Sequence, residues 1–187
     1  MHAVEPGDAF RQASQLFLDR LAHAGAEQWS SPTPCSEWNV HALVNHVVGE
    51  WLWVPDMMAG KTVADVGTKY DGDVLGDDPQ TTAIRARGAA VEAFEAAGAM
   101  TRTVHLSFGD VPGAEYATQM GVDATIHSWD LASAVAGDTR LPEDVVDFTY
   151  RALRDQADQW RAAGGFGPER EPADDTTQAK LLALTGR

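Results

Sequence analysis

One stretch of the sequence places a histidine close to two aspartates, Asp123-Ala-Thr-Ile-His127-Ser-Trp-Asp130. If this stretch is helical, Asp123 and His127 lie on one face with their Cβ atoms about 5–6 Å apart. A helix with this spacing offers two ligands to a single metal ion. Asp130 falls near the same face, where its carboxylate would orient the imidazole and fix its tautomer. The stretch therefore predicts part of a metal centre.

A third ligand must come from another part of the chain, and His46 is the best candidate. It lies among valines at 44, 47 and 48, and a buried imidazole without a partner forfeits its hydrogen bonds. Helical bundles build metal sites in their cores from side chains on facing helices. We therefore predict a divalent metal site formed by His46, Asp123 and His127. An Asp-x-x-x-His pair also arises by chance, and a lone buried histidine is usually an ordinary core residue, so spacing leaves a metal-free interpretation open.

Two further side chains, Glu50 and Cys35, could carry chemistry by their type. Glu50 follows His46 by four residues and is a fourth ligand, a substrate contact or an exposed carboxylate. Cys35 lies in a proline-containing turn without an adjacent histidine or basic residue, so we interpret it as structural. The sequence contains no glycine-rich phosphate loop and no nucleophile elbow.

The charge balance narrows the possible partners. The chain has 28 acidic and 14 basic residues, a net charge of -14, and no cluster of Lys and Arg. Nucleic acids and anionic membrane surfaces are disfavoured, which leaves small molecules and proteins. The single cysteine excludes an internal disulfide, and the N-terminus lacks the pattern of a signal peptide, so we expect a cytoplasmic protein.

Helical periodicity and helix-end signals divide the chain into its expected elements. They predict helices over residues 8–25, 39–60, 78–98, 114–136 and 141–163, with a short docking helix at 180–184. Pro55 should kink or shorten the second helix. Residues 61–77, rich in Asp and Gly, form a long loop with room for one helical turn. Residues 103–108 form a short extended segment that points Val104, Leu106 and Phe108 inward.

These elements favour an all-α fold. Consecutive amphipathic helices pack most simply as a four-helix bundle, and no alternation of strands and helices indicates a parallel sheet. We expect one domain over residues 1–187, with the core bundle at about 8–137. A further C-terminal helix and a tail occupy about 138–187.

Three stretches of the chain resemble known proteins. The sequence TPCSEWNVHALVNHV at 33–47 resembles the second-helix signature of actinobacterial proteins in the DinB-like superfamily. The sequence DATIHSWDLA at 123–132 resembles their fourth-helix signature, and the ending LLALTGR is also similar. The likeness is closest to the branch related to the N-terminal, metal-binding domain of mycothiol-dependent maleylpyruvate isomerase.

The resemblance implies a DinB-like four-helix bundle that holds a divalent metal on its second and fourth helices. His46, Asp123 and His127 match the ligand positions. The isomerase branch has Glu where this chain has Asp123, whose side chain is one methylene shorter. The isomerase also has a second domain that contributes to its active site. This chain has another helix and a tail there, which argues against maleylpyruvate isomerisation.

We expect a metal-dependent transferase or isomerase that uses a low-molecular-weight thiol of the mycothiol type and a small electrophile. Zinc is the expected metal, and nickel and iron(II) also suit two imidazoles and a carboxylate. One alternative is a stress protein that binds metal or a small ligand without turnover. Another is a metal-free helical interaction module. The sequence leaves open whether the chain forms a homodimer.

Overall fold

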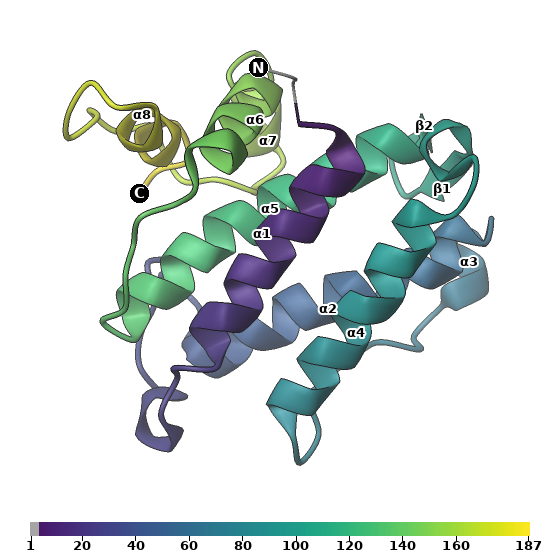
Figure 1. Cartoon of the computed structure of the whole chain (residues 1–187), viewed down its shortest axis with the longest axis horizontal. Helices are drawn as coiled ribbons and strands as arrows, with labels where there is room; N and C mark the ends of the chain where they lie inside the picture. The colour runs from purple at the N-terminus through teal and green to yellow at the C-terminus, as the bar shows by residue number, and fades with distance from the viewer. Residues whose placement is uncertain (1–3) are drawn as a thin grey trace.

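The computed structural model describes residues 4–187 and confirms the mainly helical fold (Figure 1). The four long helices are α1 (Pro6–Leu21), α2 (Val40–Met58), α4 (Pro79–Glu95) and α5 (Gly113–Ala134). Both α1 and α2 pack against α4 and α5, which makes these four helices a bundle. The shorter elements are η1 (Ala26–Gln28), α3 (Val63–Val66), η2 (Ala99–Thr101), β1 (Thr103–Leu106), β2 (Gly109–Pro112), α6 (Glu143–Leu153), α7 (Ala157–Ala162) and α8 (Thr177–Leu184).

Helix α1 begins and ends earlier than predicted. Its first residue is Pro6, which suits the first helical position because its missing N–H would have no helical partner there. Asp8, the expected cap, instead lies in the first turn and forms an ion pair with Arg11 at 2.7 Å. The helix ends at Leu21, four residues before Gly25.

Helix α2 has the predicted start but does not break at its proline. The side chain of Asn39 accepts a hydrogen bond from the backbone N–H of Ala42 at 2.9 Å, as expected of a cap. The helix then continues through Pro55 to Met58, so of the two predicted outcomes, a kink or a shortened helix, the shortening at Pro55 does not occur. Pro55 lies in the last turn, and its carbonyl still accepts a hydrogen bond from Ala59 at 3.0 Å.

The segment from 61 to 77 contains the single short helix α3 and returns to α4. Thr62 caps α3, and Asn45 of α2 holds the later part of the segment through hydrogen bonds to the backbone at Gly72 and Val74. Asp78 caps α4 and Pro79 is its first residue, as predicted. The helix ends at Glu95 because the next residue adopts an extended conformation.

The extended segment at 103–108 is one arm of an antiparallel hairpin made by β1 and β2. Val104 is fully buried and Leu106 is partly buried, in agreement with the predicted alternation. Phe108 does not point inward, because it occupies the turn between the two strands and is 68% exposed.

The predicted helix at 141–163 is two helices. Gln156 leaves helical geometry, with φ -124° and ψ -4°, and separates α6 from α7. Helix α6 packs against α5 and α8, so the C-terminal region forms a layer beside the bundle (Figure 1). This layer has a second, smaller hydrophobic cluster that includes Ile126, Leu153 and Leu181.

Tight packing between α1 and α5 sets the position of the middle of α5. A Cβ atom added to Gly121 would lie 3.3 Å from the backbone nitrogen of Phe10, so glycine permits the close approach of the two helices. Asp123 lies two residues further along this fixed stretch. Within residues 4–187, no helix combines the length and the apolar character needed to cross a membrane.

Candidate metal centre

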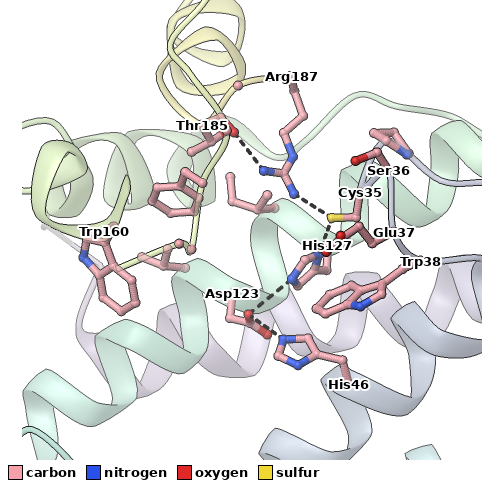
Figure 2. A pocket seen from close by; sticks show the side chains of 18 of the residues that line it. Cys35, Ser36, Glu37, Trp38, His46, Asp123, His127, Trp160, Thr185 and Arg187 are labelled. Atoms are coloured by element: carbon pink, nitrogen blue, oxygen red, sulfur yellow. Dashed lines mark hydrogen bonds and ion pairs between the residues drawn. The ribbon is translucent and has the colours of Figure 1, made fainter. Parts of the chain in front are cut away.

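The structure brings together the three residues predicted to bind metal. His46 projects from α2, and Asp123 and His127 project from consecutive turns of α5 (Figure 2). The Nε2 atoms of His46 and His127 lie 3.2 Å and 3.4 Å from the same oxygen, Asp123 Oδ1. The two imidazole rings are 5.2 Å apart at their centroids. Residues 77 positions apart in the sequence therefore present their donor atoms to one point.

The donor set fits a divalent cation. One potential ligand atom from each of the three residues lies within 4.8 Å of the other two. The second carboxylate oxygen, Asp123 Oδ2, is buried and has no hydrogen-bond partner among the described residues. A buried oxygen without a partner carries a desolvation penalty that a bound cation would remove. Two imidazoles and one carboxylate are also ligands that zinc commonly takes.

The opposite edge of the His127 ring contacts Asp130. His127 Nδ1 lies 2.9 Å from Asp130 Oδ2, and the Asp130 side chain is fully buried. An ionised carboxylate only accepts hydrogen bonds, so Nδ1 is the donor. In the neutral ring this leaves the lone pair on Nε2, the atom that faces Asp123 and His46. Asp130 therefore has the position predicted for it, that of a residue that orients a ligand.

Arg187 contacts Asp130 as well. We call the group formed by the Nδ1 edge of His127, Asp130, Cys35 and Arg187 the second cluster. Arg187 donates hydrogen bonds to both oxygens of Asp130, at 3.0 Å and 2.6 Å, and to Cys35 Sγ at 3.1 Å. Its side chain is only 8% exposed. Gly186 precedes it with φ +79°, and a Cβ at that position would lie 2.9 Å from the backbone of Gly167. This close contact between two glycines seats the end of the chain against the site.

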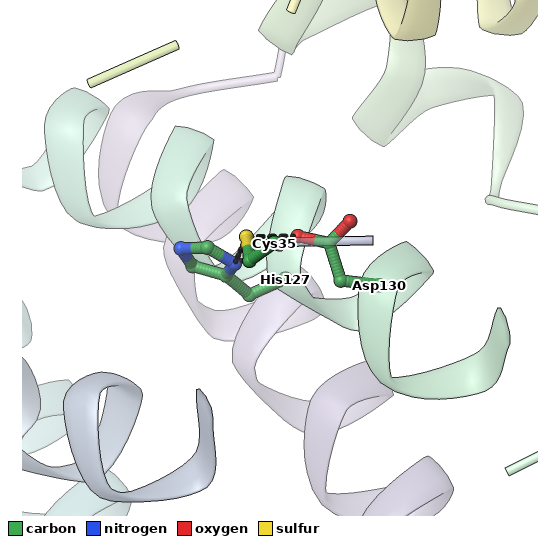
Figure 3. A group of neighbouring side chains, drawn as sticks. All are labelled: Cys35, His127 and Asp130. Atoms are coloured by element: carbon green, nitrogen blue, oxygen red, sulfur yellow. Dashed lines mark hydrogen bonds and ion pairs between the residues drawn. The ribbon is translucent and has the colours of Figure 1, made fainter. Parts of the chain in front are cut away.

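Cys35 also belongs to the second cluster, so it has partners outside its own turn. Its sulfur lies 3.3 Å from Asp130 Oδ2 and 4.0 Å from His127 Nδ1 (Figure 3). Cys35, His127 and Asp130 would also be close enough to share a metal ion. However, the guanidinium of Arg187 already supplies a positive charge to both Asp130 and Cys35. The second cluster is therefore balanced in charge without a metal.

The electrostatics of the two clusters follow from these contacts. Burial alone would raise the pKa of Asp123, but the imidazoles of His127 and His46 hold it well below its usual value. Burial would lower the pKa of both histidines, and the Asp123 carboxylate raises it instead, most strongly for His127. Burial would likewise raise the pKa of Asp130, which His127 and Arg187 lower. In the absence of a bound cation, each carboxylate and its neighbouring imidazole or guanidinium therefore favour one another's charged form.

Trp38 and Glu50 flank the candidate metal ligands. The Trp38 ring lies 4.7 Å from that of His46 and 5.7 Å from that of His127, so it covers both imidazoles. Glu50 Oε1 is 4.0 Å from Nδ1 of His46, on the far edge of the ring from Asp123. Burial and the nearby charge of Asp123 raise the pKa of Glu50. Glu50 lies beside the group of three donors rather than within it.

The candidate ligands line a cavity of about 750 Å³. Its walls come from the turn around Cys35, from α2 and α5, and from the C-terminal layer, which contributes Trp160, residues 164–168 and Arg187. A cavity of this size accommodates a small organic molecule. In the described chain, the aspartate-rich loop at 61–77 contributes no residue to the lining of this cavity. The tryptophans that line it are Trp38 and Trp160.

Comparison with known proteins agrees with the resemblance drawn from the sequence. The family model of the mycothiol maleylpyruvate isomerase N-terminal domain matches residues 10–132, a span that includes His46, Asp123 and His127. Two uncharacterized proteins of Mycobacterium tuberculosis, from strains CDC 1551 / Oshkosh and ATCC 25618 / H37Rv, are each 33% identical over 187 residues. Each alignment covers 98% of this chain and 98% of the relative. No solved structure matches the chain significantly. The chain therefore belongs to the mycothiol maleylpyruvate isomerase N-terminal domain family.

Proposed function

We propose that this protein is a metal-dependent S-transferase or isomerase that uses a low-molecular-weight thiol of the mycothiol type as cosubstrate. The observation that carries the proposal is the position of the His46, Asp123 and His127 donors in the wall of the cavity. A structural metal site is normally closed by four protein ligands, whereas a catalytic site keeps a position open to solvent or substrate. Within residues 4–187, the group around Asp123 Oδ1 has three members and faces the cavity.

The ion we propose is zinc, held by Nε2 of both histidines and by the Asp123 carboxylate. When bound, it would favour the thiolate form of a coordinated thiol at neutral pH and so make it a nucleophile. The name of the family supplies the reason to propose a mycothiol-type thiol. The second substrate would be a small electrophile that enters the same cavity.

The remaining side chains of the site would position these groups. Asp130 orients His127 through Nδ1, and Arg187 holds Asp130 in its ionised form by two hydrogen bonds. Trp38 covers both imidazoles, which limits the access of water to one side of the ligands. Glu50 lines the cavity next to His46 and is placed to contact a bound substrate.

The test combines elemental analysis with a turnover assay on protein purified without a histidine tag. We expect about one equivalent of divalent metal per chain and consumption of an electrophile that depends on an added low-molecular-weight thiol. His127→Ala is the inactive control, and His41→Ala is the matched variant, a histidine on α2 that lies outside the cavity. Stoichiometric metal without turnover in a broad panel of electrophiles would favour the non-catalytic alternative. Absence of metal after supplementation would overturn the proposal as a whole.

A further inference from the structure

The cavity has an apolar side that the metal ligands do not use. Helix α5 presents Val122 and Ile126 next to Asp123, and Trp160 and Phe166 of the C-terminal layer face the same space. The rings of Trp160 and Phe166 lie 6.1 Å apart at their centroids, with their planes at 37°. We call Val122, Ile126, Trp160 and Phe166 the apolar wall. Figure 2 shows Trp160 on one side of the cavity and Trp38 and Cys35 on the other, with Asp123 between them.

The rim of the cavity contains an exposed aromatic ring. Phe108, at the turn of the β1–β2 hairpin, lines the same cavity and is 68% exposed. Exposed large apolar side chains beside a cavity are typical of a binding surface for an apolar ligand. The apolar wall and Phe108 thus offer aromatic contacts both inside the cavity and at its edge.

The charges of the lining do not favour an anionic ligand. Three carboxylates line the cavity, at Glu37, Glu50 and Asp123, together with two guanidiniums, at Arg170 and Arg187. Arg187 is already bound to Asp130 and Cys35. With Arg187 offset by Asp130, the three carboxylates are balanced by Arg170 and the proposed divalent ion, so a dianionic substrate would find no excess of positive charge here. An uncharged molecule with an apolar body would meet the apolar wall and needs no such excess.

We propose that the substrate of this site is an uncharged electrophile with an aryl or alkyl body, which packs against the apolar wall while its reacting atom faces Asp123 and the two histidines. This inference rests on the proposed function, whose site it shares, and it adds the class of the second substrate. The thiol sulfur would form a bond to the electrophilic carbon while the bond from that carbon to its leaving group breaks; the leaving group departs with the electron pair, the thiol proton passes to solvent, and the product is a thioether that carries the same apolar body. Binding of that body depends on apolar contacts and therefore does not require a bound metal.

Isothermal titration calorimetry with a series of uncharged thioethers tests this inference. The probes are S-methyl, S-butyl, S-hexyl and S-benzyl derivatives of N-acetylcysteamine, with maleate as the small dianion. We expect affinity to rise about two- to fourfold per methylene from S-methyl to S-hexyl, as burial of each methylene predicts. The same rise is expected in protein stripped of metal by a chelator, and maleate should bind more weakly than the S-hexyl probe.

Matched variants assign the effect to the apolar wall. Trp160→Ala and, independently, Phe166→Ala should flatten the dependence of affinity on chain length. Trp53→Ala is the control, because Trp53 stacks on Tyr70 outside the cavity and its removal should leave the dependence intact. Circular dichroism verifies that each variant is folded.

Three results would overturn the inference: equal affinity for all the thioethers in the wild type, tighter binding of maleate than of the S-hexyl probe, or the same loss of chain-length dependence in the Trp53 variant. Since the binding assay works without metal, its failure is distinct from the absence of a metal site.

Discussion

The two edges of the His127 ring face environments that look alike in composition but differ in charge balance. On the Nδ1 edge, Asp130 accepts hydrogen bonds from His127 and Arg187, and Cys35 accepts one from the same guanidinium. On the Nε2 edge, Asp123 faces two imidazoles and keeps one buried oxygen without a partner among the described residues.

The difference shows that residue types alone do not identify a metal site. Both groups contain a histidine, a carboxylate and a third potential ligand within 4.8 Å. The guanidinium of Arg187 supplies a cation to one group, and the other group has a place for one. We therefore assign an orienting role to the Asp130 edge and a ligand role to the Asp123 edge.

The largest expected effect comes from His127→Ala, which removes the residue common to both edges. Metal should no longer be retained after dialysis, because only His46 and Asp123 remain as donors. The loss of affinity should exceed the 10- to 100-fold typical of changes to residues that orient a ligand. Elemental analysis measures the metal, and circular dichroism should show that the helical content is kept. Full retention of metal in this variant would contradict the ligand role of His127.

Asp130→Asn should have the next largest effect. It leaves Arg187 buried without a carboxylate, a change that typically destabilises a protein by about 3–5 kcal/mol, and an amide orients the imidazole less firmly. We expect metal affinity to fall by about 10- to 100-fold and the free energy of unfolding to fall by several kcal/mol. Chemical denaturation measures the second effect. The double variant Asp130→Asn, Arg187→Gln should recover part of the lost stability, and a purely additive result would argue against their coupling.

Cys35→Ser alters the Asp130 edge of the His127 ring and should change metal affinity little. Serine keeps a hydrogen-bond acceptor for Arg187, and the charge of Arg187 remains paired with Asp130. We expect metal affinity within about threefold of the wild type, because positioning changes below about 1 kcal/mol correspond to factors of this size. A competitive chelator titration measures it. Loss of the metal in this variant would place the ion at the Cys35 edge instead.

Asp56, like Asp130, is a carboxylate held by cationic side chains, but its partners are exposed. Its substitution should have the smallest effect on stability. Asp56 binds Lys61 and Lys69, each at 2.8 Å, and accepts a hydrogen bond from Tyr70 at 2.9 Å. The hydrogen bonds from the two lysines lower the pKa of Asp56 below its usual value. Because both lysines are about half exposed, Asp56→Asn should reduce stability by only about 1 kcal/mol at neutral pH.

The sign of the pH dependence of this last effect follows from the lowered pKa. A carboxylate whose pKa is lower in the folded state contributes its full stabilisation at pH values above its pKa in the unfolded chain, which is about 3.9. This stabilisation is lost as the pH falls below that pKa. Denaturation of the wild type and Asp56→Asn at a series of pH values should show the two stabilities converging below about pH 4. A difference that grows on acidification would contradict the assignment.

The fold could be predicted where local signals act alone. Asn39 as a cap, the Asp78–Pro79 start of α4 and the four long helices all follow from short-range rules. The errors have two causes, tertiary packing at Gln156 and local hydrogen bonding at Pro55. The chain breaks near Gln156 to form a separate layer, and α2 passes through Pro55 because the rest of its last turn stays hydrogen-bonded.

The candidate site could be predicted only in part for the same reason. The spacing of Asp123, His127 and Asp130 lies within one helix and is visible in the sequence. The convergence of His46 with them was a hypothesis that the bundle geometry now supports. The contact between Cys35 and Arg187 spans 152 positions, and no periodicity or motif spacing encodes it. The only sequence signal was that both residues fall in stretches that resemble the family.

The most direct test of the metal site is a crystal structure of the zinc-supplemented protein with an anomalous difference map at the zinc edge. We expect one strong peak within coordination distance of Nε2 of His46, Nε2 of His127 and the carboxylate of Asp123, with Arg187 still bound to Asp130. A peak on the Cys35 side of His127, or no peak in protein that has been supplied with zinc, would contradict this prediction.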